Sequence, residues 1–362
     1  NNIYYRKQCS LMYDYLKGFF RNYFYEEEQF AALFLLIIAS ILLYFVGSTI
    51  TPIFVSILVA YLLNGVMTLF EQKDYSKRLS FYFTFAIFLI FYFFILLSLP
   101  YVTGQIASLI NELPAIVAFV ENLLNDLAFR YPNFFTTEQV EEIFASSASF
   151  IPSIAEQVLI QLNTGFSAIM NALVFLILIP ILVFFFLKDK SEMLSYFTYF
   201  LPNKRSLLSQ IWSDLNIQLF GYVRGKALEM LIVGSITTIA FLILGVNYSI
   251  ILGILVGMSV LIPLFGAILV TIPVVAIGLF QWGLDTSFYI FLITYFLIQI
   301  LDGNVLFPLL MGNEVNLHPV LIILSILVFG GIWGFWGLLL AVPIATLIRA
   351  VFKVWPKKEL VS

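Results

Sequence analysis

The chain has 362 residues, of which 62% are hydrophobic and only 11% are charged, and its formal net charge is −3. Water-soluble domains carry roughly 25% charged residues, so this composition excludes a soluble globular protein, and the small net charge does not indicate a nucleic-acid partner. A single cysteine, Cys9, excludes an intrachain disulfide and a cysteine-based metal site. We therefore expect a membrane protein in contact with lipid, with no cofactor and no metal.

The distribution of lysine and arginine predicts the orientation of the chain. Seventeen of the 18 basic residues lie in five clusters between apolar segments, Arg130 is the exception, and no basic residue occurs within 227–348. Basic residues accumulate on the cytoplasmic side of membrane proteins, so both termini are expected to be cytoplasmic. The clusters are Arg6/Lys7/Lys17/Arg21, Lys73/Lys77/Arg78, Lys188/Lys190/Lys204/Arg205, Arg224/Lys226 and Arg349/Lys353/Lys357/Lys358.

The N-terminal part of the chain predicts a cytoplasmic arm followed by three spans. Residues 1–29 are polar and aromatic, which suits an amphipathic arm at the membrane surface. Apolar segments at about 30–46, 51–70 and 79–103 approach the ~20 residues that cross ~30 Å of hydrocarbon. We expect these three transmembrane helices, within 30–103, to form a frame.

Residues 104–163 differ from their surroundings, because they contain seven acidic residues and one base. This charge places the segment outside the cytoplasm, and apolar residues between Ile106 and Leu127 recur at helical spacing. Thr136 and Gln139 form the pattern of a capping box that opens another helix. We expect extracytoplasmic amphipathic helices whose apolar faces pack on the bundle or on lipid. The alternative is a lid that collects substrate.

The middle of the chain predicts a return to the cytoplasm. A fourth transmembrane helix and a basic cytoplasmic loop are expected within 164–205. Residues 206–226 have apolar side chains on one face, which predicts an interfacial helix. A transport unit is expected at 227–348, and the basic segment 349–362 is expected to be a cytoplasmic tail.

Residues 227–348 begin and end on the cytoplasmic side, so they contain an even number of crossings. Either there are four full spans, or there are two spans and two re-entrant hairpins. A weak internal similarity connects 250–280 with 320–348, because each contains a glycine followed by a proline about two turns later. Such paired interruptions indicate inverted repeats around a central site. The alternative is that glycine and proline are simply common in membrane helices. The pairs are Gly266 with Pro273 and Gly337 with Pro343.

The fold class that we predict is an all-α polytopic integral membrane protein. It would have about eight membrane-embedded helical segments, some of them broken or re-entrant, plus the extracytoplasmic amphipathic helical region. The candidate helix breaks and hinges are Pro263, Gly266, Pro273, Gly303, Pro308, Gly337 and Pro343.

Several short motifs lie in order between residues 220 and 350. They begin at Gly221, Leu244, Ile262, Asp302, Met311, Leu317 and Gly330, and read GYVRGK, LGVNY, IPLFG, DGNVLFP, MG, LHP and, from GG, on to AVP at Ala341–Pro343. As a set they resemble the motifs of the autoinducer-2 exporter (AI-2E) family of membrane permeases. Asp302 stands where the family more often has Glu, and Lys226 where it more often has Gln. The resemblance implies a bacterial inner-membrane transporter that forms a homo-oligomer, with a pentamer as the expected assembly. Family members are linked to export of the signal autoinducer-2 and others to Na⁺(Li⁺)/H⁺ exchange.

Ionisable residues within membrane segments are costly and usually face a cavity, so they are the candidate binding residues. Asp302, next to Gly303, is suited to accept hydroxyls, bind Na⁺ or take up a proton, and the alternative is an acid at a helix end. Glu229 is expected to pair with Arg224 or Lys226 as an inner gate or as a plain interfacial ion pair. Asn304 and Asn316 offer donors and acceptors for an uncharged, sugar-like ligand.

The sequence contains no catalytic constellation of Ser, His and Asp or of Cys and His, and no phosphate-binding loop. We therefore expect a transporter and not an enzyme. The favoured function is export of a small polar, autoinducer-2-like signal by alternating access, with the site between the two broken segments. One alternative is a Na⁺(Li⁺)/H⁺ antiporter that uses Asp302 and Glu229. Another is a structural partner of envelope proteins that acts through the acidic outer helices.

Overall fold

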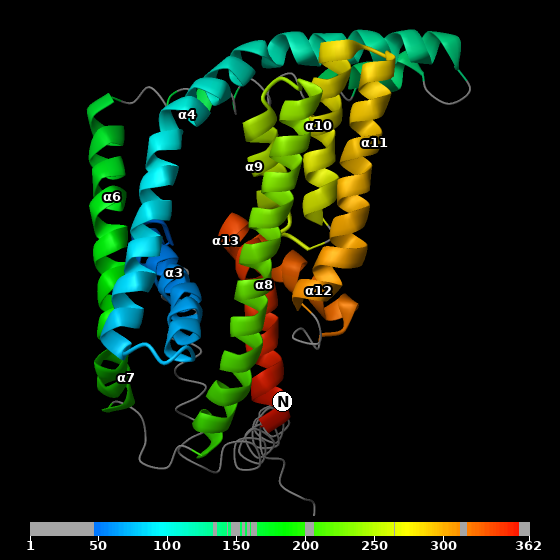
Figure 1. The fold of residues 1–362 in the computed structure, drawn as a ribbon. Helices are drawn as coiled ribbons and strands as arrows, with labels where there is room; N and C mark the ends of the chain where they lie inside the picture. Colours follow the sequence, from blue (N-terminus) through cyan, green and yellow to red (C-terminus); the bar gives the residue numbers. More distant parts are fainter. Residues whose placement is uncertain are drawn as a thin grey trace, which may run out of the picture. The chain divides into compact units, whose positions relative to one another are not determined.

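The structure is a computed structural model, and it describes residues 47–132, 136–142, 165–199, 206–263, 265–311 and 317–354, together with isolated positions between 144 and 160. Every regular element in this described part is a helix (Figure 1). The helices are α3 (Gly47–Glu71), α4 (Lys77–Arg130), α6 (Gly165–Lys188), α7 (Lys190–Tyr199), α8 (Ser206–Leu244), α9 (Ser249–Ser259), α10 (Phe265–Trp282), α11 (Thr286–Leu301), the π-helix η1 (Asp302–Leu306), α12 (Phe307–Met311) and α13 (Pro319–Val354).

Five helices of this described part are long and apolar enough to cross a membrane, and further apolar helices are shorter. The protein is therefore an all-α polytopic membrane protein, which confirms the predicted fold class. The first expected span, 30–46, lies outside the described residues. The second and fourth expected spans correspond to α3 and α6.

The chain divides into two compact units. One unit comprises Leu63–Ile181 and Val223–Gly312, and the remainder of the chain forms the other. The first unit contains α4, the second half of α8, and the helices from α9 to α12. The division assigns Val223–Gly312 and Asn313–Ser362 to different units, and the transport unit expected at 227–348 stays a prediction.

Two expected helix boundaries, near residues 103 and 226, lie inside continuous helices. The third span and the first outer helix form one continuous helix, α4, whose far part passes over the ends of α9 and α10 (Figure 1). Pro100 and Pro114 lie inside α4, and a proline removes a backbone hydrogen bond and bends a helix. The expected interfacial helix likewise continues into the next span as α8.

The Thr136–Gln139 capping box is confirmed, because the backbone N–H of each residue donates to the side chain of the other, at 3.1 and 3.3 Å.

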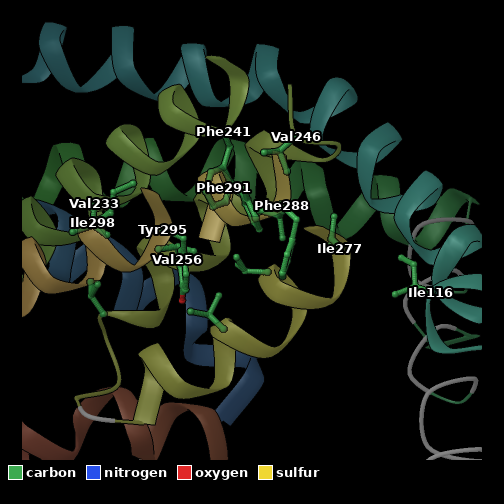
Figure 2. Close-up of a cluster of buried hydrophobic side chains, with 14 residues drawn as sticks. Ile116, Val233, Phe241, Val246, Val256, Ile277, Phe288, Phe291, Tyr295 and Ile298 are labelled. Carbon is green, nitrogen blue, oxygen red and sulfur yellow. The ribbon is translucent and has the colours of Figure 1, made fainter. Parts of the chain in front are cut away.

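Aromatic and branched side chains from α8, α9, α10 and α11 form the core of the first unit (Figure 2). The ring centroids of Phe241 and Phe291 are 5.0 Å apart, and both side chains are fully buried. A side chain at Gly278 would overlap the Phe291 ring. Glycine at this position therefore lets α10 and α11 approach each other closely.

A partly buried hydrogen-bond chain, centred on the buried Tyr295, also connects α10 and α11. Gln299 Nε2 donates to the Tyr295 hydroxyl at 3.0 Å, and this hydroxyl lies 2.7 Å from Thr271 Oγ1. Thr271 Oγ1 in turn donates to the carbonyl oxygen of Ala267 at 2.7 Å. Since the Thr271 hydrogen is used in that last bond, the Tyr295 hydroxyl is the donor toward Thr271.

The segment 250–280 is a helical hairpin with unequal arms. The helix α9 has 11 residues and so extends about 16 Å, which is too short for ~30 Å of hydrocarbon. Pro263 lies in the turn that follows, and a side chain at Gly266 would overlap the carbonyl oxygen of Ser259. Glycine therefore permits the tight contact between the two arms.

The segment 320–348, in the other unit, also contains a chain reversal with a glycine at a close contact. The backbone of α13 breaks at Gly334, where φ is 57° and ψ is −133°. A side chain at Gly337 would overlap the carbonyl oxygen of Phe329, although eight residues along a straight helix would span about 12 Å. The chain therefore reverses sharply, and the paired glycines favour two hairpins over four full spans.

The second unit also has contacts of its own between α8 and other helices. Ile211 of α8 packs with Leu347, Ala350 and Val351 of α13. The Tyr61 hydroxyl donates to the carbonyl oxygen of Asn216 at 2.9 Å.

Candidate functional site

A buried ion pair lies on α8, within the first unit. Lys226 Nζ is 2.9 Å from Glu229 Oε2, and the two side chains are only 6% and 3% exposed. Residues three apart lie on the same face of a helix, one turn from each other. Both charges are therefore removed from solvent together, on the face of α8 that packs inside the unit.

Asp302 joins this pair from α11 and η1. The carboxyl groups of Glu229 and Asp302 lie close enough to interact with each other, and the Lys226 charge acts on both. Asp302 Oδ1 is buried and has no hydrogen-bond partner among the described residues. We call Lys226, Glu229 and Asp302 the buried charge cluster.

The backbone is irregular where Asp302 enters the cluster. Asp302 opens the π-helix η1, which also contains Gly303 and Asn304. Single π turns inside α-helices are rare and occur frequently at functional sites. The extra residue in the turn changes the direction in which the Asp302 side chain leaves the helix.

The close packing of α8 against α12 positions Lys226. A side chain at Gly225 would lie 2.9 Å from Met311 Sδ and 3.0 Å from the carbonyl oxygen of Leu310. Lys226 Nζ then lies 5.2 Å from the centroid of the Phe307 ring, which is a cation–π contact. The ammonium group is thus held by a carboxylate and an aromatic face.

The cluster contains two carboxyl groups and one ammonium group, so full ionisation leaves one uncompensated negative charge. Buried charges are costly unless they are paired. One proton, or one monovalent cation, makes the cluster neutral. Chemically, the arrangement is suited to take up and release a single positive charge.

The other predicted binding residues do not join the cluster. Asn304 is exposed and its Nδ2 donates to the carbonyl oxygen of Ile300 at 2.9 Å. Arg224 is exposed on α8, and Glu229 pairs with Lys226 instead. Asn316 lies outside the described residues. The prediction that Glu229 pairs with a nearby base is thus met by Lys226.

The predicted helix breaks lie at several kinds of position. Pro263 and Gly266 flank the reversal between α9 and α10, and Gly337 follows the break in α13. Gly303 lies in η1. The three remaining prolines lie inside helices, at Pro273 in α10, Pro308 in α12 and Pro343 in α13.

The sequence analysis named Lys226 only as one of two expected partners of Glu229 and not as a binding residue. The available signal was its spacing of three from Glu229, together with the lack of any further base before Arg349. Spacing alone does not distinguish a buried pair from an exposed one, so only the fold identifies Lys226 as part of the site.

The fold defines a multi-pass membrane protein with a charge cluster inside one of its two units. The family described as "AI-2E family transporter" matches residues 33–357, and the chain belongs to this family. It is 37% identical to the putative permease PerM of Escherichia coli K12, over 96% of this chain and 99% of that protein. It is 29% identical to the putative transport protein YueF of Bacillus subtilis, over 85% and 84% of the two chains. A second B. subtilis relative, the putative transport protein YrrI, is 26% identical over 83% and 84%.

Proposed function

We propose that the protein is a secondary transporter that exports a small polar, autoinducer-2-like molecule by alternating access, with the buried charge cluster as its coupling site. The observation that carries this proposal is the buried Lys226–Glu229 ion pair, with the half-buried Asp302 carboxyl group beside it. The family description, which refers to AI-2E transport, supports the class of cargo. We also propose a homo-oligomer in the bacterial inner membrane with cytoplasmic termini, based on the basic clusters and on the family resemblance.

The charge of the cluster suggests how uptake of a proton drives movement. With one proton bound, two carboxyl groups and one ammonium group sum to zero charge, and a neutral group moves through hydrocarbon at lower cost. Loss of that proton leaves a net negative charge, which disfavours passage through the low-dielectric interior. The protonated cluster therefore permits the change of access, and the deprotonated cluster prevents it.

The glycine-dependent reversals provide the mobile elements for alternating access. The tight contact at Gly266 lies in the same unit as the cluster, between α9 and α10. Interrupted helices in paired positions are typical of transporters that move one repeat against another. We propose that Gly303, beside Asp302, allows the π-helix to change its local geometry during this step.

The test is transport into and out of liposomes that contain only this protein. We expect labelled autoinducer-2 to move, with a change of internal pH that depends on its movement. Asp302→Asn should remove the pH-linked component, because it removes an exchangeable proton with little change in shape. Asp285→Asn is the matched control, since Asp285 is exposed at the opposite end of α11. Equal pH-linked transport by both variants would refute the assignment of the coupling site.

A second candidate function is Na⁺(Li⁺)/H⁺ exchange, and the excess of carboxylates over ammonium groups in the cluster favours it. Na⁺ prefers oxygen ligands, and the unpartnered Asp302 Oδ1 offers one. The same liposomes distinguish the two functions. A Na⁺-dependent change of internal pH in the absence of autoinducer-2, lost in Asp302→Asn, would establish the antiporter.

A further inference from the structure

An open, partly polar cavity lies at the end of α8, away from the buried charge cluster. Its volume is about 590 Å³, which is within the usual range for small-molecule sites. Leu244, the last residue of α8, is about 27 Å along the helix axis from Lys226, so the two sites are separate. The cavity lies between α4 and the turn that connects α8 to α9, and is lined by Pro100, Tyr101, Gly104, Gln105, Ser108, Glu112, Asn247 and Tyr248.

Two hydrogen bonds hold the turn that forms one wall of the cavity. Gln281 of α10 accepts a hydrogen bond from the Asn247 backbone N–H, and its Nε2 donates to the carbonyl oxygen of Gly245, both at 2.7 Å. Tyr248 follows in the left-handed region, with φ 60° and ψ 25°. Bulky residues rarely adopt this conformation, and such outliers cluster at ligand-binding sites. The turn therefore presents a tyrosine where asparagine or glycine would be easier to accommodate.

The chemistry of the wall combines a carboxylate with aromatic rings. Tyr248 lies beside Glu112, and burial together with this acid raises the pKa of Tyr248 to about 12. The phenol therefore stays protonated and offers a hydrogen-bond donor on the cavity wall. Tyr101 provides a second ring, and Gln105 has a buried side-chain oxygen with no hydrogen-bond partner among the described residues.

The charge around the cavity attracts cations. The segment 104–163 contains seven acidic residues and one base, and that base, Arg130, is engaged with Asp126 at 3.0 Å. None of the ion pairs within the described part of the chain includes Glu112. Acidic surfaces raise the local concentration of cations and disfavour anions.

We propose that this cavity is a binding site for a small organic ammonium ion. The Glu112 carboxylate would neutralise the ligand, and the rings of Tyr101 and Tyr248 would contact its alkyl groups and its charge, as aromatic side chains do in known sites for quaternary ammonium groups. An N–H donor on a primary amine would also find the unpartnered oxygen of Gln105.

The experiment measures choline binding to the full chain in nanodiscs of uncharged lipid, by isothermal titration calorimetry at constant ionic strength. We expect saturable binding that Glu112→Gln weakens by about tenfold or more. Glu121→Gln, on the same helix but not lining the cavity, should bind like the wild type. Tyr248→Asn keeps a residue that tolerates the left-handed backbone but lacks the ring, and it should also weaken binding.

Three outcomes would overturn the proposal. Equal affinities in Glu112→Gln and Glu121→Gln would mean that only the general surface charge attracts choline. Glucose binding that matches choline binding would make the cavity a polyol site. Loss of choline binding in Asp302→Asn would place the ligand at the buried charge cluster, whereas the proposal expects no change in that variant.

Discussion

Two ion pairs of the first unit have nearly the same local geometry and very different surroundings. The Lys226–Glu229 pair on α8 has an N–O distance of 2.9 Å and side chains 6% and 3% exposed. The Asp126–Arg130 pair on α4 has a distance of 3.0 Å and side chains 52% and 66% exposed. Burial, and not distance, determines the energetic consequence of breaking such a pair. Glycines and hydroxyl groups in this fold can be compared in the same way, one at a buried or closely packed position and one at an open position.

The largest effect is expected from Lys226→Met, because it leaves the buried Glu229 carboxylate without its cation. We expect the free energy of unfolding in detergent to fall by about 3 kcal/mol and transport to be lost. Lys353→Met is the control, since the Lys353 side chain is 63% exposed in its pair with Asp214. The double variant Lys226→Met/Glu229→Leu should recover part of the lost stability. A Lys226→Met protein as stable as the control would contradict the importance of burial.

The next largest effect is expected at a closely packed glycine, Gly266, compared with a glycine in open space, Gly104. Gly266→Ala should lower the free energy of unfolding by about 2 kcal/mol, because its side chain would overlap a backbone carbonyl that cannot rotate away. Gly104→Ala has no atom within 4 Å of the added carbon and should be close to neutral or stabilising. Thermal unfolding of the two variants in the same detergent would measure the difference. If both variants unfolded at the same temperature, the hairpin contact at Gly266 would not be tight.

Much of the fold could be predicted from the sequence, because hydropathy and charge report directly on lipid and on orientation. The capping box at Thr136 and the reversals near Gly266 and Gly337 were also visible as local patterns. The helix boundaries near 103 and 226 could not be predicted correctly in this way. Hydropathy reports where a chain leaves apolar surroundings, whereas backbone hydrogen bonds continue through both positions.

The candidate site was predictable only in part. Asp302 and Glu229 stood out as acids inside apolar segments, but the chain separates them by more than 70 residues, and only tertiary packing brings them together. In the sequence, Asn304 was a candidate binding residue just as Asp302 was. Asn304 is exposed, and its side chain hydrogen-bonds to the backbone carbonyl of Ile300. Which residues of a polar motif converge depends on the π turn at Asp302, which has no clear sequence signature.

A smaller effect is expected from Tyr295→Phe in the partly buried hydrogen-bond chain. The change removes one hydroxyl and leaves Gln299 Nε2 without its acceptor, so the free energy of unfolding should fall by about 1 kcal/mol. Tyr289→Phe, on the same helix but half-exposed, is the matched control and should have no measurable effect. Chemical denaturation of both proteins would sharpen the comparison, because only the surroundings of the hydroxyl differ.

The smallest effect is expected from Arg130→Ala, which breaks the exposed pair with Asp126. Solvent screens both charges, and exposed pairs of this spacing contribute about 0.5 kcal/mol or less. The change in stability should also disappear in high salt, since the Debye length falls to about 3 Å at 1 M, whereas the effect of Lys226→Met should persist because ions do not reach the buried charge cluster. A loss of stability in Arg130→Ala that is large and independent of salt would mean that α4 is covered at this position by another part of the assembly, so that the exposed pair is in fact a buried one.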